Sequence, residues 1–101
     1  MSNRDSFDIR NLPFVITHYL VTMRVIGEIP HPDCKITLFH WNNRYLIKLE
    51  QGPFEQTFKI QEFDLTSEED IKQVVSEAFI QAALKRFESM GQSLGQAMSG
   101  I

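Results

Sequence analysis

A hairpin-forming run in the middle of the chain constrains its fold more than any other stretch. Residues 35–50, KITLFHWNNRYLIKLE, are rich in β-branched and aromatic side chains on both sides of Asn42-Asn43. Such residues favour strands. Asparagine tolerates a positive φ, so a two-residue Asn-Asn loop can close a type I′ turn. We therefore expect an antiparallel hairpin in which Leu38 lies opposite Ile47.

Residues 54–61 follow a Gln51-Gly52-Pro53 turn and predict a third strand. If Glu50 pairs with Glu55, one face of the three-stranded meander is almost entirely apolar. That face holds Ile36, Leu38, Tyr45, Ile47, Leu49, Phe58 and Ile60, with His40 and Gln56 as its polar members. A shift of one residue would send this set to opposite faces, so the pattern supports the register.

Residues 64–90 predict one long helix. Thr66 and Glu69 have the spacing of a capping box at its start. An apolar stripe at helical spacing should pack on the sheet; it consists of Ile71, Val74, Val75, Ala78 and Ala82. Farther along, the apolar residues lie about a third of a turn away from this stripe. They are Ala83, Leu84, Phe87 and Met90. Either the helix bends, or its last turns contact something other than the sheet.

Residues 12–26, LPFVITHYLVTMRVI, carry conflicting signals. Asn11 suits a helix N-cap, Pro13 suits a first turn and Gly27 suits the end, so we favour a helix. Seven β-branched residues favour a strand, and the alternative is that residues 14–26 form a fourth strand of the sheet. The glycine and two prolines of residues 27–34 predict a loop.

A chain of 101 residues is the size of one domain. We predict an α+β fold: a helix, a three-stranded antiparallel β-meander, and a long C-terminal helix packed on the sheet. Residues 1–10 are expected to be a flexible lead-in, residues 11–90 a single domain, and the Gly- and Ser-containing residues 91–101 a flexible tail.

The net charge of −3 lacks the positive field that draws proteins to nucleic acid or anionic membranes. The apolar run from Leu12 to Ile26 is too short to span a bilayer, and the polar first ten residues are unlike a signal peptide. Cys34 is the only cysteine, which excludes an intrachain disulfide and suits a reducing compartment. We expect a soluble, cytoplasmic protein.

No catalytic motif, metal site or cofactor site is evident. The candidates for a ligand or nucleophile are His31, Cys34 and His40. A zinc site needs about four ligands, and a thiol nucleophile needs a base and an oxyanion site, none of which can be assigned. An enzyme or ligand-binding protein with a pocket near these three residues is the alternative function.

The face of the hairpin opposite the expected core carries Phe39, Trp41, Arg44 and Leu46. Trp, Phe and Arg are favoured at the centres of protein interfaces. This face is covered either by the N-terminal helix or by another protein, most simply a second copy. The last helical turns, with Leu84, Phe87 and Met90, form a second candidate surface. Trp41 and Arg44 also allow nucleic-acid binding, as a weak alternative because the local positive charge is small.

The sequence therefore predicts a non-enzymatic interaction or oligomerisation module that binds itself as a homodimer, or another protein. A small acidic helix–meander–helix arrangement resembles secretion-chaperone-type dimers in architecture alone. The resemblance implies a chaperone-like or regulatory role.

Overall fold

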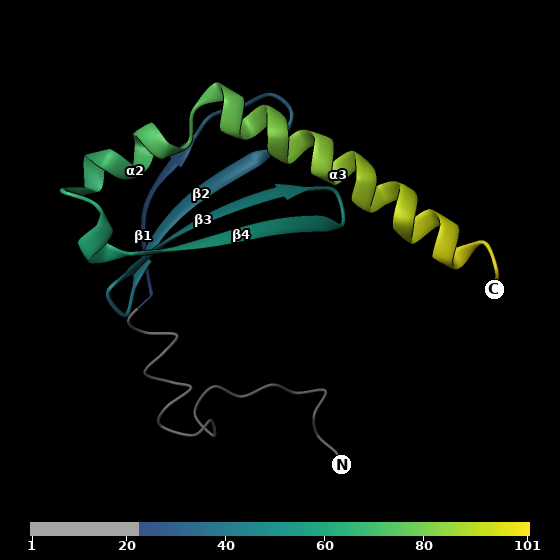
Figure 1. Cartoon of the computed structure of the whole chain (residues 1–101), viewed down its shortest axis with the longest axis horizontal. Helices are drawn as coiled ribbons and strands as arrows, with labels where there is room; N and C mark the ends of the chain where they lie inside the picture. Colours follow the sequence, from purple (N-terminus) through teal and green to yellow (C-terminus); the bar gives the residue numbers. More distant parts are fainter. Residues whose placement is uncertain (1–22) are drawn as a thin grey trace, which may run out of the picture.

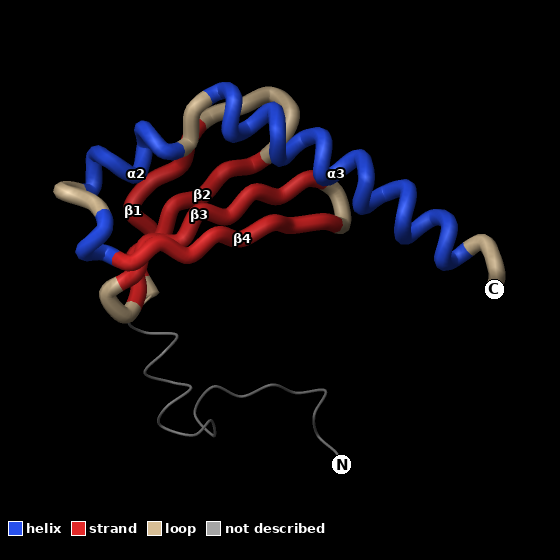
Figure 2. Tube along the Cα trace, in the orientation of Figure 1, coloured by secondary structure: helices blue, strands red, loops and turns tan. Residues whose placement is uncertain are grey.

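The structure is a computed structural model that describes residues 23–101 (Figure 1). It is an α+β fold with one antiparallel sheet in the order β1-β2-β3-β4. The strands are β1 (Arg24–Ile29), β2 (Lys35–Trp41), β3 (Arg44–Gln51) and β4 (Phe54–Gln61). A 3-10 turn, η3 (Glu62–Asp64), leads to the helices α2 (Glu68–Val74) and α3 (Glu77–Met98). Figure 2 shows both helices on the same side of the sheet.

The predicted register of the meander is confirmed. Leu38 pairs with Ile47, and Glu50 pairs with Glu55. Asn42 and Asn43 have φ values of 52° and 60°, as the type I′ turn requires. The second tight turn has Gly52 at its first central position with φ 59°. Glycine adopts this left-handed conformation without steric cost, which explains its place at this turn.

The apolar face of the meander forms the core, as predicted. Eleven buried residues of the described chain form one cluster: Cys34, Ile36, Leu38, Tyr45, Ile47, Leu49, Ile71, Val75, Ile80, Ala83 and Phe87. Phe58 and Ile60 are half-buried and pack against this cluster. Burial of each large side chain contributes about 1.5–3 kcal/mol of transfer free energy, so this layer is the main source of stability.

The favoured helix over residues 12–26 is wrong at its described end, because Arg24–Ile29 form β1. The alternative, a fourth strand, is confirmed there; residues 12–22 lie outside the described residues. β1 also runs through the start of the expected 27–34 loop, which begins only at Pro30. Pairing with β2 satisfies the backbone of this segment, and a register irregularity between Val25 and Gly27 accommodates the glycine within the strand.

The single predicted helix over residues 64–90 is interrupted at Val75 and Ser76. The N-cap of α2 is Ser67, one residue after the predicted Thr66. Asp70, rather than Glu69, closes the capping box, because its Oδ2 accepts hydrogen bonds from the N–H groups of Thr66 and Ser67 at 2.8 and 3.3 Å.

The interruption explains the drift of the apolar stripe. It shifts the helical phase so that Ile80, Ala83 and Phe87 face the sheet, whereas Ala78 and Ala82 are exposed. The helical turns that carry Ala83 and Phe87 therefore do contact the sheet. α3 continues through Gly91 to Met98, and Figure 1 shows this end projecting past the sheet. No helix within residues 23–101 is long and apolar enough to cross a membrane.

Candidate functional site

The candidate functional surface is the face of the sheet opposite α2 and α3. No helix of residues 23–101 lies on this face, and it is here called the helix-free face. Side chains alternate along each strand, so the observed register assigns every second residue to it. The residues assigned to the helix-free face include Val25, Phe39, Trp41, Arg44, Leu46, Lys48, Glu55, Thr57 and Lys59. The predicted pairs Phe39–Leu46 and Trp41–Arg44 are both present on β2 and β3.

The centre of the helix-free face is apolar. Leu46 is 5% exposed and Phe39 is half-buried, and on β1 the neighbouring Val25 is 59% exposed. A hollow of about 200 Å³ lies beside this centre. It is lined by Met23, Phe39, Leu46, Lys48, Glu55, Thr57 and Lys59. An apolar centre with a polar rim is the usual anatomy of a protein-binding surface.

The charged side chains on the rim form weak ion pairs within the chain. Lys48 Nζ lies 3.7 Å from Glu55 Oε1 and 4.0 Å from Glu50 Oε2. All three side chains are partly or largely exposed, and such pairs contribute about 0–1 kcal/mol. Their charges are therefore available to an approaching partner at little cost in stability.

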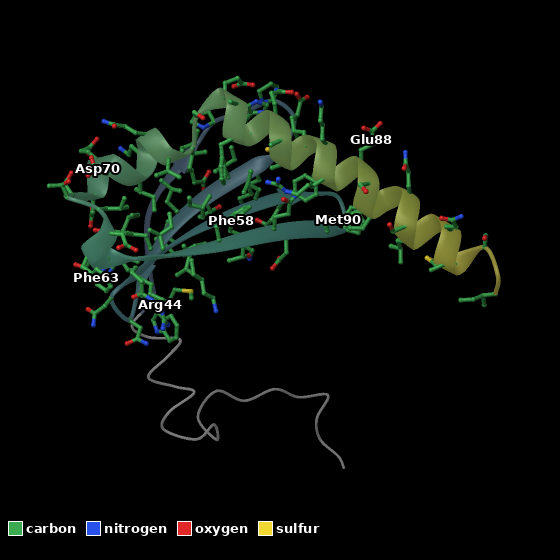
Figure 3. The ribbon with its side chains drawn as sticks, in the orientation of Figure 1. Arg44, Phe58, Phe63, Asp70, Glu88 and Met90 are labelled. Atoms are coloured by element: carbon green, nitrogen blue, oxygen red, sulfur yellow. The ribbon has the colours of Figure 1, made fainter. Side chains whose placement is uncertain are left out.

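The second group of predicted interaction residues lies on the other face of the sheet. Phe87 is 1% exposed, and Leu84 and Met90 pack against the same core cluster. Figure 3 shows Met90 on the sheet side of α3 and Glu88 pointing away from it. Because these side chains already contact the core of their own chain, we do not include them in the candidate surface.

Besides Val25, three exposed apolar side chains of η3 and α3 were not among the predicted site residues. Phe63 on η3 is 83% exposed, and Leu94 and Met98 on the projecting end of α3 are 44% and 58% exposed. The spacing of four residues between Leu94 and Met98 was the only signal in the sequence. Phe63 borders an open hollow of about 710 Å³ between the Asn42-Asn43 turn and the start of α2.

His31, Cys34 and His40 do not form one site. Cys34 precedes β2 and His40 lies near its other end, so the two are roughly 20 Å apart at about 3.3 Å per residue. His31 Nε2 lies 3.4 Å from Glu77 Oε2, whereas His40 Nε2 lies 3.0 Å from Glu62 Oε1. The hollow of about 440 Å³ beside His31 and Cys34 does not include His40.

The environment of Cys34 is that of a structural thiol. Burial raises its pKa, and the carboxylates of Asp33 and Glu77 raise it further. A raised pKa keeps the thiol protonated, whereas a nucleophilic cysteine needs the thiolate. Within residues 23–101, no three His, Cys, Asp or Glu side chains are grouped so as to hold a metal ion.

Comparison with known protein families finds no family model that matches the chain, and comparisons with curated proteins and with solved structures find no significant match.

Proposed function

We propose that this protein is a non-enzymatic interaction module that self-associates and uses the helix-free face to contact protein, with a chaperone-like or regulatory role. The observation that carries the proposal is the apolar centre of that face. In the described part of the chain, both helices pack on the opposite face and no element covers Phe39 and Val25 from above.

A polar face would be expected on a sheet with helices on one side only, because the other side then meets water. The helix-free face departs from this rule at Val25, Phe39 and Leu46, and follows it at Lys48 and along β4. Apolar patches with a polar rim commonly mark sites of protein contact. The separation of Cys34 from His40 further favours binding over catalysis.

We also propose a cytoplasmic location. The support is Cys34, which is the only cysteine of the chain and is buried as a free thiol. A reducing compartment suits such a protein, because no disulfide is needed to hold the fold.

Light scattering across a dilution series tests self-association. The mass should rise with concentration toward twice the 11.7 kDa of the single chain. A monomer at every concentration, together with fluorescence emission of Trp41 typical of a fully solvated indole, would contradict the proposal.

Two variants then locate the contact. Val25→Asp places a carboxylate on the helix-free face, and Leu94→Asp places one on the projecting end of α3; both side chains are exposed, so both variants should fold. Loss of association in Val25→Asp alone would make the helix-free face the contact between copies. If Val25→Asp associates as the wild type does, the helix-free face is instead the contact for a different protein.

A further inference from the structure

We propose that two copies of this chain pair through their β4 strands, joining their sheets into one antiparallel sheet of eight strands. The proposal rests on the self-association proposed above, and it names the surface and the geometry of the contact. It leaves the helix-free faces of the two copies side by side on one surface.

The outer edge of β4 has backbone groups available for this pairing. In the part of the chain that the structure describes, β3 is the only strand beside β4. Phe54 faces Gln51 across the turn, and the N–H of Glu62 donates a hydrogen bond to Asn43 O at 3.0 Å, so the even-numbered residues are the ones that bond to β3. Along an antiparallel strand, residues that bond to one neighbour alternate with residues that do not. The N–H and C=O groups of the odd-numbered residues of β4 therefore point outward.

The other edge of the sheet is less suited to pairing. β1 has only 6 residues, its register is interrupted between Val25 and Gly27, and Pro30 follows it directly. Short length, irregularity and proline are the devices that protect sheet edges. β4 has 8 residues in an unbroken register with β3 and no proline within it. It is therefore the more open of the two edges.

The charges of β4 match those of a second β4 in one register. When the two strands pair about a two-fold axis at Thr57, Glu55 lies opposite Lys59 of the partner subunit, and Lys59 lies opposite Glu55 of the partner subunit. Moving the axis by one residue, to Gln56 or Phe58, leaves both charges without an opposite partner. A two-fold contact must be complementary to itself, and this register meets that condition. Opposite charges at facing positions stabilise strand pairs.

The same pairing gives the exposed apolar side chains a common contact. α3 passes over Phe54 at Gly91, where an added Cβ would lie 3.7 Å from the phenyl ring, and then projects beyond the strand. The antiparallel partner strand ends beside Phe54 and continues there into its own η3. The exposed Leu94 and Met98 of one copy therefore come toward the exposed Phe63 of the partner subunit.

Two charge reversals test the register. In Glu55→Lys every facing pair at these positions is Lys–Lys, and in Lys59→Glu every one is Glu–Glu. Two attractive pairs become repulsive in each homodimer, so the dissociation constant should rise roughly tenfold or more. In an equal mixture of the two variants, every facing pair is again Lys–Glu, and a mixed dimer should form with nearly the affinity of the wild type.

The matched controls lie on β3, one strand away from the edge. Glu50→Lys and Lys48→Glu change the charge by the same amount on the same face, and each, like Glu55→Lys, breaks a weak ion pair of Lys48 within the chain. Both should keep the wild-type mass. Circular dichroism melting of all four variants checks that each is folded at the temperature of the mass measurement.

Crosslinking provides a second measurement that does not depend on charge. Thr57 would face its own copy on the two-fold axis, at a Cα separation of about 5.5 Å that suits a disulfide. Thr57→Cys should form a disulfide-linked dimer on mild oxidation, whereas Glu28→Cys on β1 should not. The native Cys34 is buried and should not interfere.

The outcomes separate the two proposals. A wild type that is monomeric at every concentration overturns both. A wild-type dimer that persists unchanged in Glu55→Lys and Lys59→Glu keeps self-association but overturns the pairing of β4. A mixture of the variants that stays monomeric, while the controls on β3 are dimeric, also overturns the pairing. Constant Trp41 emission as the mass doubles is expected, because β2 lies two strands from the paired edge.

Discussion

The hydroxyl oxygen of Ser76 accepts a hydrogen bond from the backbone N–H of Phe79 at 3.2 Å, and this contact starts α3. α2 has ended at Val74, so the two helices meet at a short kink rather than forming one rod. The kink decides which side chains of α3 face the sheet. Ala83 and Phe87 are buried because of it, being 0% and 1% exposed.

Ser76→Ala should lower the free energy of unfolding by about 1 kcal/mol, because the N–H of Phe79 loses its acceptor at the start of the helix. Ser89→Ala is the matched control within the same helix. Ser89 is exposed, and alanine has the higher helix propensity, so this variant should be neutral or slightly stabilising. Urea denaturation followed by circular dichroism measures both, and equal effects would show that Ser76 is no cap.

Phe87→Ala should lower the free energy of unfolding by about 3–5 kcal/mol, because it leaves a cavity between α3 and the sheet. A loss of this size is a large part of the 5–15 kcal/mol typical of a whole domain. Glu88→Ala, one residue on, should change it by less than about 0.5 kcal/mol, since Glu88 points into solvent. If Phe87→Ala has only a small effect, the helical turn around Phe87 becomes a candidate contact surface again.

The Cys34 thiol should react slowly with alkylating reagents in the folded protein and quickly in denaturant. Burial and the carboxylates of Asp33 and Glu77 raise its pKa, so both the accessible fraction and the thiolate fraction are small near neutral pH. Alkylation rates across a pH series measure this. A rate that levels off well below pH 8.5, about the pKa of a free thiol, would instead indicate an activated cysteine.

Asp70→Asn should reduce stability at neutral pH but not in acid. The hydrogen bond from the N–H of Thr66 is the main cause that lowers the pKa of Asp70 from its usual 3.8. Because the folded pKa is the lower one, the stabilisation is fully present above pH 3.8 and is lost as the pH falls through the folded value. The melting temperatures of wild type and variant should therefore converge in acid.

Glu69→Gln is the control for this comparison. It removes the same charge from the same turn of α2, but within residues 23–101 the partner of Glu69 is the exposed Lys72 at 3.9 Å. Its melting temperature should follow that of the wild type more closely across the pH range. Parallel behaviour of the two variants would assign the effect to the helix dipole rather than to the capping hydrogen bonds.

The hairpin could be predicted because it depends on residues that lie close together in the sequence. Asn42 and Asn43 tolerate the positive φ of the turn, and the turn then determines which residues face each other. The period of two along β3 and β4 determines which of them point to the core, so the buried face with Leu38 and Ile47 followed from spacing alone.

The segment at β1 could not be predicted in the same way. Gly27 followed by Pro30 suits the end of a helix as well as an interrupted edge strand, and local propensity does not distinguish the two. Tertiary pairing decides between helix and strand. The edge of β2 has backbone groups that need hydrogen-bond partners, and Arg24–Ile29 supply them as a strand.

The sequence by itself determined the turns, the register of the meander and the two faces of the hairpin, because each depends on residues a few positions apart. The tertiary structure decided which face the helices cover, where the long helix breaks, and that His40 lies far from Cys34. It also placed β4 at an edge of the sheet formed by residues 23–101, with Glu55 and Lys59 on either side of Thr57. These features depend on packing between distant segments, since the exposure of a residue is set by what lies across the sheet from it and not by its neighbours in the chain.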